Sequence, residues 1–277
     1  MTSEIITPKR KPIRVAIAGL GAIGLAVARA IDEGLENYTL GAVSARNHSA
    51  AADRLHFLKT PVPIVPLEEL ENCADIVIEC APAELLPKIA EPFLKSQKTV
   101  IVLSSGALLA NSYLIDMAAK TGGKIIVPSG ALLGLDAVSA AAEGNIESVE
   151  MVTRKPVRGL VGAPHLIENN IDITQLTEPL KVFDGTAGEA AIGFPANLNV
   201  AVALSLAGIG PERTKLQIWA DPNLTLNTHK IVVKSDSANF EMSIVNIPTE
   251  NPKTGRITSL SVIAALRNLN GPIRIGT

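Results

Sequence analysis

Three glycines near the start of the chain have the spacing Gly-x-Gly-x-x-Gly, which is typical of dinucleotide-binding proteins. The apolar run 13–18 before them has the length of a strand, and residues 25–31 after them have the pattern of a buried helix. In this context the first glycine permits a tight turn, the second admits a pyrophosphate, and the third lets the helix pack closely. A glycine-rich turn of another α/β protein is the alternative interpretation. The expected dinucleotide contacts are Gly19, Gly21, Ala22, Ile23 and Gly24.

Histidine is the side chain best suited to exchange protons near neutral pH, and the chain has four of them. His48 and His56 follow the second expected strand, where a surface role is the simpler interpretation. His165 lies in an irregular segment that could line a cleft or remain solvated. His229 lies between a polar turn and an apolar strand, so it could project from a rigid element. We therefore take His229 as the candidate general acid/base, with a hydrogen-bonded structural histidine as the alternative.

The end of the second expected strand, 38–44, bears on the choice of coenzyme. An Asp or Glu about 20 residues beyond the glycines would bind the ribose 2′-hydroxyl of NAD. The sequence there is Ser44-Ala45-Arg46-Asn47, which contains no carboxylate. Arg46 and Ser44 could instead hold a 2′-phosphate, although Arg46 could also be a solvated loop residue. NAD or NADP is thus expected as the cofactor, with NADP or dual use favoured.

Three further strands are expected over 75–80, 98–103 and 124–127, with helical segments between them. In an open parallel sheet, ligands bind beyond the carboxyl ends of the strands. The residues that follow these strands should therefore surround one cleft, which adds Cys80, Ala81 and Ser105 to the cofactor contacts. Cys80 could be a nucleophile, but no histidine is near it in sequence, so a small buried strand-end residue is the favoured interpretation.

The composition is typical of a two-domain enzyme with buried parallel strands. The chain has 277 residues, 47% hydrophobic and only 3% aromatic, with a formal net charge of -2. This charge argues against nucleic acid or an anionic membrane surface as a partner. Two cysteines imply no disulfide framework, and no metal-ligand spacing is present. The first twelve residues lack an apolar core, so we expect no signal peptide, and no apolar stretch is as long as a membrane span, so we expect a cytoplasmic protein.

The second half of the chain has a different pattern. Strands are expected over 149–153, 216–220, 230–235 and 239–246, with an apolar helix over 200–207. This succession is typical of an antiparallel or mixed sheet. The expected fold is α/β: an N-terminal Rossmann dinucleotide-binding domain, 1–127, and a C-terminal mixed α+β domain, 128–251. The segment 252–277 contains a helix, 258–269, which we expect to pack back against the first domain.

Four stretches carry a resemblance to the L-aspartate dehydrogenase family, and the resemblance extends over essentially the full length. They are VPSGALLGLDAV (127–138), VTRKP (152–156), FPANLNVAVALSLAG (194–208) and ADPNLTLNTHKI (220–231). The resemblance implies a Rossmann domain and a mixed α/β domain that carries catalysis and dimer contacts. It implies His229 as the catalytic histidine, and Ala131 and Asn199 as contacts on the nicotinamide side. Cys80 and the segment 158–173 depart from the family pattern.

The family oxidises L-aspartate to iminoaspartate with NAD or NADP, or runs the reverse amination, and several members supply NAD biosynthesis. Such a reaction moves a hydride from carbon to nicotinamide and a proton from nitrogen, after which water adds and ammonia leaves. One side chain that titrates near neutrality, such as His229, can serve the proton transfers. The turn residue Asp221 could orient that histidine, or could simply form the turn before Pro222.

A dicarboxylic amino acid also needs cations in its site. The candidates near the expected catalytic strands are Arg154, Lys155, Arg158 and Lys230, each of which could equally be a solvated charge. Two alternatives remain open. One is a dehydrogenase or imine reductase for a related acidic amino or imino acid, and the other is a regulatory protein that binds NAD(P) without turnover. A homodimer is expected from the family and from a second sheet that needs covering.

Overall fold

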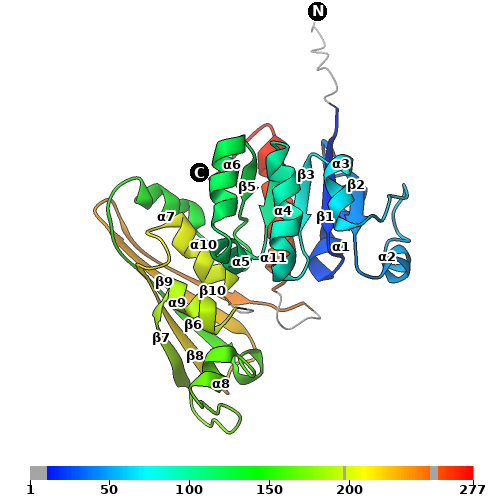
Figure 1. The fold of residues 1–277 in the computed structure, drawn as a ribbon. Coiled ribbons are helices and arrows are strands. Elements are labelled where there is room, and N and C mark those ends of the chain that lie inside the picture. The colour runs from blue at the N-terminus through cyan, green and yellow to red at the C-terminus, as the bar shows by residue number, and fades with distance from the viewer. Residues whose placement is uncertain (1–10, 196–197, 250–254, 277) are drawn as a thin grey trace, which may run out of the picture.

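The computed structural model describes residues 11–195, 198–249 and 255–276, which form two sheets and their helices (Figure 1). The first half contains β1 (Ile13–Ala18), α1 (Ala22–Asp32), β2 (Tyr38–Ser44), α2 (His48–Arg54), η1 (Leu67–Glu69), α3 (Leu70–Cys73), β3 (Ile76–Glu79), η2 (Ala83–Leu85), α4 (Leu86–Lys95), β4 (Thr99–Val102), α5 (Ser105–Ala110), α6 (Tyr113–Thr121) and β5 (Lys124–Ile126). The second half contains α7 (Leu135–Ala142), β6 (Ile146–Pro156), η3 (Val157–Gly159), α8 (Pro164–Glu168), β7 (Leu180–Thr186), α9 (Ala187–Gly193), α10 (Asn199–Ala207), β8 (Thr214–Asp221), β9 (Asn227–Ser235), β10 (Asn239–Asn246) and α11 (Arg256–Asn270).

The first sheet is parallel, with the strand order β2-β1-β3-β4-β5. Its strands are apolar on both faces because helices cover both faces. Along β1, Val15 and Ile17 pack in a cluster with α1, whereas Ala16 and Ala18 pack in a cluster with α3, α4 and α6. This is the Rossmann-type sheet that the βα alternation predicts, so the first half of the fold-class prediction is confirmed.

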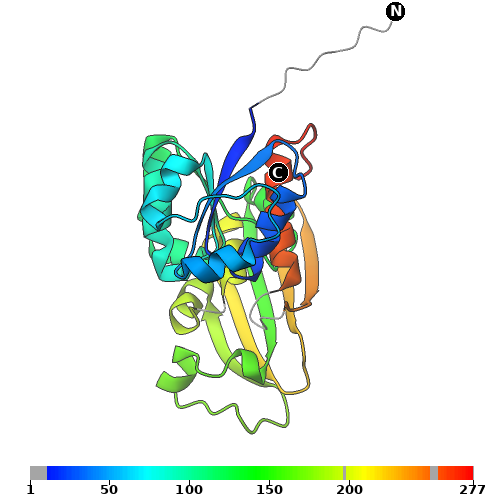
Figure 2. The ribbon, with the colours of Figure 1, turned by 90° about the vertical axis from the view of Figure 1, so that its right-hand side faces the viewer.

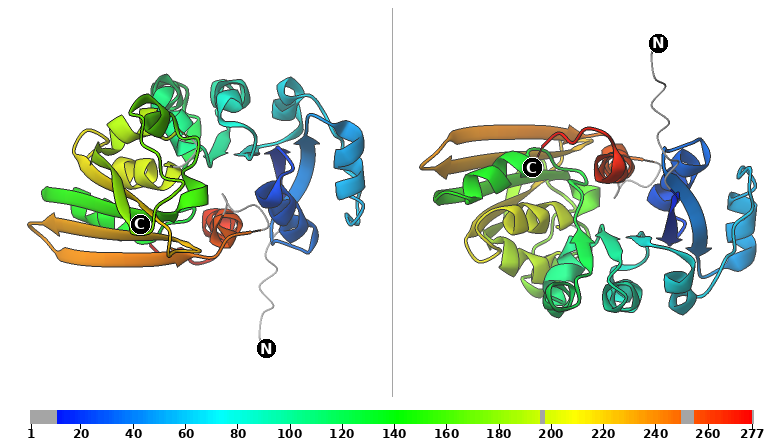
Figure 3. Two further views of the ribbon diagram at one scale, coloured as in Figure 1. Left: turned by 90° about the horizontal axis from the view of Figure 1, so that it is seen from below. Right: turned by 90° about the horizontal axis from the view of Figure 1, so that it is seen from above.

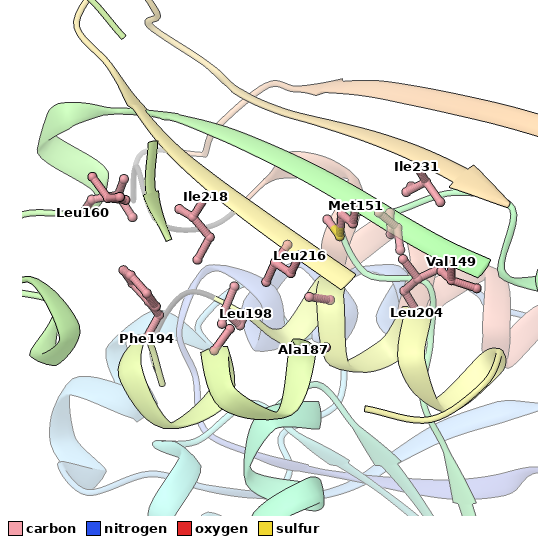
Figure 4. Close-up of a cluster of buried hydrophobic side chains, with 14 of the residues drawn as sticks. Val149, Met151, Leu160, Ala187, Phe194, Leu198, Leu204, Leu216, Ile218 and Ile231 are labelled. Carbon is pink, nitrogen blue, oxygen red and sulfur yellow. The ribbon is translucent and has the colours of Figure 1, made fainter. Parts of the chain in front are cut away.

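The second sheet is mixed, with the strand order β10-β9-β6-β8-β7. Only β6 and β8 run parallel, and the remaining neighbours are antiparallel. Helices α7, α9 and α10 lie on one face of it (Figure 3). Figure 4 shows the core between them, where Met151 and Leu216 of the strands face Ala187 and Leu198 of the helical layer. The mixed second sheet is as predicted.

The last helix, α11, crosses back to the first sheet and lies beside α1 (Figure 2). Val262 and Leu266 are fully buried there, in the same cluster as Val27 of α1. The Tyr38 hydroxyl donates a hydrogen bond of 2.6 Å to the carbonyl oxygen of Leu266. The C-terminal helix thereby covers a face of the first sheet, and it connects to the end of β10 in the second.

Two elements differ from the sequence prediction in ways that matter for the site. Strand β9 begins at Asn227, not at 230, so His229 lies inside a strand and not at its edge. The polar stretch before residue 185 contains β7 and the short helix α8. Strand β7 is an edge strand in which only Val182 is buried, so it lacks the apolar alternation that reveals a strand. Of the described helices, none is long and apolar enough to cross a membrane.

Candidate active site

The glycine turn has the shape that a bound pyrophosphate requires. Gly19 has a φ of +102°, and a Cβ there would lie 2.5 Å from the carbonyl oxygen of Cys80. A Cβ on Gly24 would lie 2.1 Å from the carbonyl oxygen of Gly19. At Gly21, in contrast, a Cβ would meet no atom within 4 Å. Gly19 and Gly24 therefore allow backbone segments to approach too closely for any other residue. The space in front of Gly21, at the start of α1, is open for a ligand.

Hydrogen bonds to neighbouring segments hold this turn in place. The Gly19 amide donates to the carbonyl oxygen of Ser44 at 2.8 Å, which ties the turn to the end of β2. The guanidinium of Arg54 donates to the carbonyl oxygen of Leu20, also at 2.8 Å. Arg46 is exposed beside the end of β2. Burial raises the pKa of the Cys80 thiol well above its usual value, which argues against Cys80 as a nucleophile.

A buried carboxylate shapes the turn after β4. Glu79 accepts hydrogen bonds from the amides of Leu103 and Ser104, at 3.0 and 2.8 Å, and from the Ser104 hydroxyl at 3.0 Å. The next residue, Ser105, donates through its hydroxyl to the carbonyl oxygen of Asn199 at 2.6 Å. The sequence predicted Ser105 and Asn199 separately, and the fold brings them into contact. Glu79 was not predicted, although a carboxylate at the end of a buried strand is an available signal.

A cavity of about 270 Å³ lies between the two halves of the fold. It is lined by residues that follow β4 and β5 of the first sheet and by residues of β6, β9 and β10 of the second. Five predicted site residues line it: Ile23, Ser105, Ala131, Asn199 and His229. Seven others are not among its lining residues: Gly19, Gly21, Ala22, Gly24, Arg46, Cys80 and Ala81. The fold thus places the predicted nicotinamide-side residues and the predicted acid/base residue around one space. The fingerprint turn lies outside that lining.

His229 faces this cavity from a rigid position. It stands opposite Thr153 in the antiparallel register of β6 and β9, and its Nδ1 lies 3.1 Å from the Thr153 hydroxyl. Its side chain is 4% exposed. Burial, together with the positive charge of Lys155, lowers the His229 pKa to about 3. The imidazole is therefore neutral at physiological pH, and in the free protein it titrates below the neutral range that the sequence prediction assumed, because it is buried beside a positive charge.

Lys155 lies two residues beyond Thr153 on the same face of β6, and it also lines the cavity. It is 5% exposed, and burial lowers its pKa to about 8. Arg158, on the η3 turn that follows, is the third charged or titratable residue among the described lining residues. Of the four predicted cations, Lys155 and Arg158 are thus the two that reach the cavity.

The other two predicted cations lie outside the cavity. The Arg154 guanidinium lies 3.7 Å from the carboxylate of Asp221, and the Lys230 ammonium lies 2.8 Å from Glu241. The possibility that Asp221 orients His229 is therefore wrong, because its carboxylate faces Arg154 across the parallel β6–β8 pair. Alternate residues of a strand point to opposite faces, and this alternation separates Arg154 from Lys155.

Asn246 is a lining residue that sequence reasoning missed. It ends β10, it is buried, and its amide nitrogen donates to the carbonyl oxygen of Ala131 at 2.9 Å. Its Oδ1 is buried without a hydrogen-bond partner among the described residues. The neighbouring Gly130 amide donates to the Ser261 hydroxyl at 3.1 Å, which fixes this loop to α11. Ala131 is therefore held by residues of both the second sheet and the last helix.

The remaining histidines are elsewhere. His165 packs against the rings of Phe183 and Phe194, at centroid distances of 5.3 and 5.2 Å. His48 and His56 are exposed. Within the described part of the chain, no group of three His, Cys, Asp or Glu residues is arranged to hold a metal ion. Of the four histidines, His229 is the one that lines the cavity.

Family models match both halves of the chain. The model described as aspartate dehydrogenase, C-terminal, matches residues 136–269. The model described as homoserine dehydrogenase, NAD binding domain, matches residues 19–128. The first match covers the second sheet and the histidine that faces the cavity, and the second covers the glycine turn and strands β2 to β5 of the first sheet.

Curated relatives match over nearly the whole chain. The L-aspartate dehydrogenase of Bradyrhizobium diazoefficiens is 58% identical over 265 residues, which cover 96% of this chain and 94% of the relative. L-aspartate dehydrogenase 3 of Bordetella bronchiseptica is 58% identical and covers 97% and 99% of the two chains. The crystal structure of the Thermotoga maritima aspartate dehydrogenase has a TM-score of 0.70 at 26% identity, and the match covers 95% of this chain and 99% of that chain. The resemblance drawn from the sequence motifs is therefore confirmed, and the chain belongs to the L-aspartate dehydrogenase family.

Proposed function

We propose that this chain is an NAD(P)-dependent dehydrogenase that interconverts L-aspartate with iminoaspartate, and hence with oxaloacetate and ammonia. The observation that carries the proposal is the inter-sheet cavity, where a buried neutral histidine and two basic residues meet the cofactor side of a Rossmann-type sheet. Its volume of about 270 Å³ suits a small substrate beside the end of a coenzyme. The names of the relatives point to the same substrate.

The coenzyme would lie across the carboxyl ends of the first sheet. Gly19, Gly21, Ala22, Ile23 and Gly24 would receive its pyrophosphate, Cys80 and Ala81 would flank it, and Ser105, Ala131 and Asn199 would border the nicotinamide. When bound, the nicotinamide ring accepts or supplies a hydride at C4. We propose the division into 1–127 with 252–277 for this part, and 128–251 for the substrate part. Residues 250–254, at the boundary, lie outside the described residues.

His229 would act as the general acid/base. Thr153 occupies its Nδ1, so we assign Nε2 to the proton transfer. The neutral ring takes a proton from the water that adds to the imine carbon, and it returns one in the amination direction. Arg158 supplies a fork of donors for a substrate carboxylate at the rim of the cavity.

The test of this function is an initial-rate assay with oxaloacetate, ammonia and either NADPH or NADH. We expect coenzyme oxidation that needs both oxaloacetate and ammonia, and coenzyme reduction with L-aspartate in the reverse direction. Turnover with another acidic keto or imino acid, but not with oxaloacetate, would favour the related-substrate alternative. Tight coenzyme binding without turnover of any such substrate would favour a regulatory NAD(P)-binding protein.

Arg46 should contribute to any preference for NADPH. It is exposed beside the end of β2, and the segment 44–47 offers no carboxylate to repel a 2′-phosphate. We expect Arg46→Ala to lower kcat/KM for NADPH by about tenfold, the equivalent of about 1.4 kcal/mol, and to leave NADH nearly unchanged. An equal loss with both coenzymes would show that Arg46 does not contact a 2′-phosphate.

We also propose a homodimer built on the uncovered face of the second sheet. Helices α7, α9 and α10 lie on the opposite face, and Figure 3 shows no described helix across this one. Val152 lies on it, between Lys230 and Gln217 in register. Analytical ultracentrifugation should give the mass of two 29.0 kDa chains for the wild type. For Val152→Glu, the measured mass should fall towards that of a single chain. Monomeric wild-type protein would contradict this arrangement.

A further inference from the structure

The cavity contains a second buried group, Lys155, for which the single-histidine scheme has no use. Strands β6 and β9 place Thr153 opposite His229, and Lys155 follows two residues later on the same face. In the parallel partner β8, the residue beside Lys155 is the small Ala220. Lys155 and His229 are 5% and 4% exposed, and both line the cavity. Two proton-exchanging groups thus reach the same small space from adjacent strands.

We propose that Lys155 is a second acid/base residue of this site, which takes a proton from the substrate's ammonium group and returns one during amination. This inference rests on the proposed function. It divides the proton transfers between two side chains, with the nitrogen served by Lys155 and the added water served by His229.

The transfers balance as follows in the direction of oxidation. The lone pair of neutral Lys155 accepts a proton from the substrate ammonium, which leaves a neutral amine and a lysine ammonium ion. The amine can then lose a hydride from its α-carbon to NAD(P)⁺, which gives NAD(P)H and an iminium ion. The lysine ammonium then releases its proton to solvent. Water adds to the iminium carbon, and the proton lost from that water passes to neutral His229, which gives a neutral carbinolamine. The carbinolamine then releases ammonia and leaves the ketone.

The electrostatics of the pair favour this order. Burial lowers the Lys155 pKa to about 8, and the charge of Lys155 helps to lower the His229 pKa to about 3. Two adjacent buried groups do not easily hold two positive charges, so Lys155 should release its proton before His229 takes one. A group with a pKa near the working pH is also the most effective proton carrier.

Few charged residues lie beside Lys155 in the described lining of the cavity. Among the described residues that line the cavity, only His229 on β9 and Arg158 on η3 are also charged or titratable. The α5, α10 and α11 segments contribute the uncharged Ser105, Asn199 and Thr258. Arg154 faces Asp221 on the other side of the sheet. Arg158 is permanently charged, so a titration near pH 8 can be assigned to Lys155.

Three variants test the inference in the full-length protein. Lys155→Met keeps the buried aliphatic length without a titrating group, and Lys155→Arg keeps a charge that cannot be released. Lys95→Met is the matched control, because Lys95 is an exposed lysine of α4 that pairs with Glu91 and is not a lining residue of the cavity. We expect Met and Arg at position 155 each to lower kcat by about 10²-fold, and the control to match the wild type.

The pH profile separates proton exchange from simple charge. Oxidation needs neutral Lys155, so wild-type kcat/KM for aspartate should rise as the pH increases through about 8. The kcat/KM of Lys155→Met should show no such rise near pH 8. In the free protein, NMR of ¹³C-labelled lysine should show one signal that titrates near pH 8 in the wild type and in Lys95→Met, but not in Lys155→Met.

Two results would overturn the role of Lys155 and leave the proposed function standing. One is a wild type that turns over aspartate while Lys155→Arg does so equally fast, because a fixed charge would then suffice. The other is a lysine NMR spectrum in which every signal titrates in the ordinary range. A wild type that turns over no acidic amino or keto acid would instead contradict the proposed function, and the role of Lys155 would fail with it.

Discussion

Replacing His229 with alanine is expected to lower kcat by about 10²–10⁴-fold in both directions, with binding of NADPH unchanged. The reason is that the variant removes the neutral imidazole that accepts the proton from water, while the glycine turn stays intact. His229 reaches the cavity from the middle of paired strands, so neighbouring side chains cannot move into its place. Thr153, its hydrogen-bond partner, cannot serve as a base near neutral pH.

The measurement is an initial-rate assay together with a titration of NADPH fluorescence. His56→Ala is the matched control, because His56 is exposed and bonds only within its own turn, through Nδ1 to the Asp53 carbonyl oxygen. We expect this control to retain wild-type rates. Equal activity of His229→Ala and the wild type would remove His229 from the mechanism. Loss of NADPH binding in the same variant would instead assign it to the coenzyme site.

Two glycine variants should both weaken coenzyme binding, but only one of them should destabilise the fold. Gly24→Ala places a Cβ 2.1 Å from the Gly19 carbonyl oxygen, a backbone atom that cannot yield without moving the turn. We expect it to lower the free energy of unfolding by at least about 1–3 kcal/mol, the usual cost of overpacking, and to abolish coenzyme binding. Gly21→Ala meets no atom within 4 Å and should unfold like the wild type.

Gly21→Ala should nevertheless bind NADPH at least about tenfold more weakly than the wild type, because the added Cβ fills the space where the pyrophosphate would lie. Thermal unfolding without coenzyme, followed by NADPH titration, distinguishes the two effects. A Gly21→Ala protein that binds NADPH normally would place the pyrophosphate elsewhere. A Gly24→Ala protein with wild-type stability would mean that α1 can move away from the turn at little cost.

Local patterns were sufficient to predict most of the fold. The run 13–18, the glycine spacing and the apolar residues 25–31 predict β1, the turn and α1, because each signal depends on residues adjacent in sequence. The strand over 38–44 coincides with β2 for the same reason. Strand β7 was missed because it is an edge strand with a single buried residue, Val182, and so has no apolar alternation. Helix α9 begins with a capping box, Thr186 to Glu189, a local signal that was present but not used.

The composition of the candidate site was predictable only in part. A resemblance in local motifs marked His229, Ala131 and Asn199, because each lies in a distinctive stretch of sequence. Partners distant in the chain, such as the Glu79 carboxylate and the turn after β4, could not be paired by sequence reasoning. Asn246 was missed for the same reason, since its contact with Ala131 joins residues 115 positions apart.

The sequence alone therefore specified which residue types and which elements this protein has, because periodicity, glycine spacing and motif resemblance are local properties. Only the tertiary structure decided which of the four cations face the cavity. That choice depends on the register of β6 against β8 and β9, which turns Lys155 inward and Arg154 towards Asp221. It also decided the charge states of Lys155 and His229, because a pKa shift depends on burial and on neighbours that the chain brings together only when it folds.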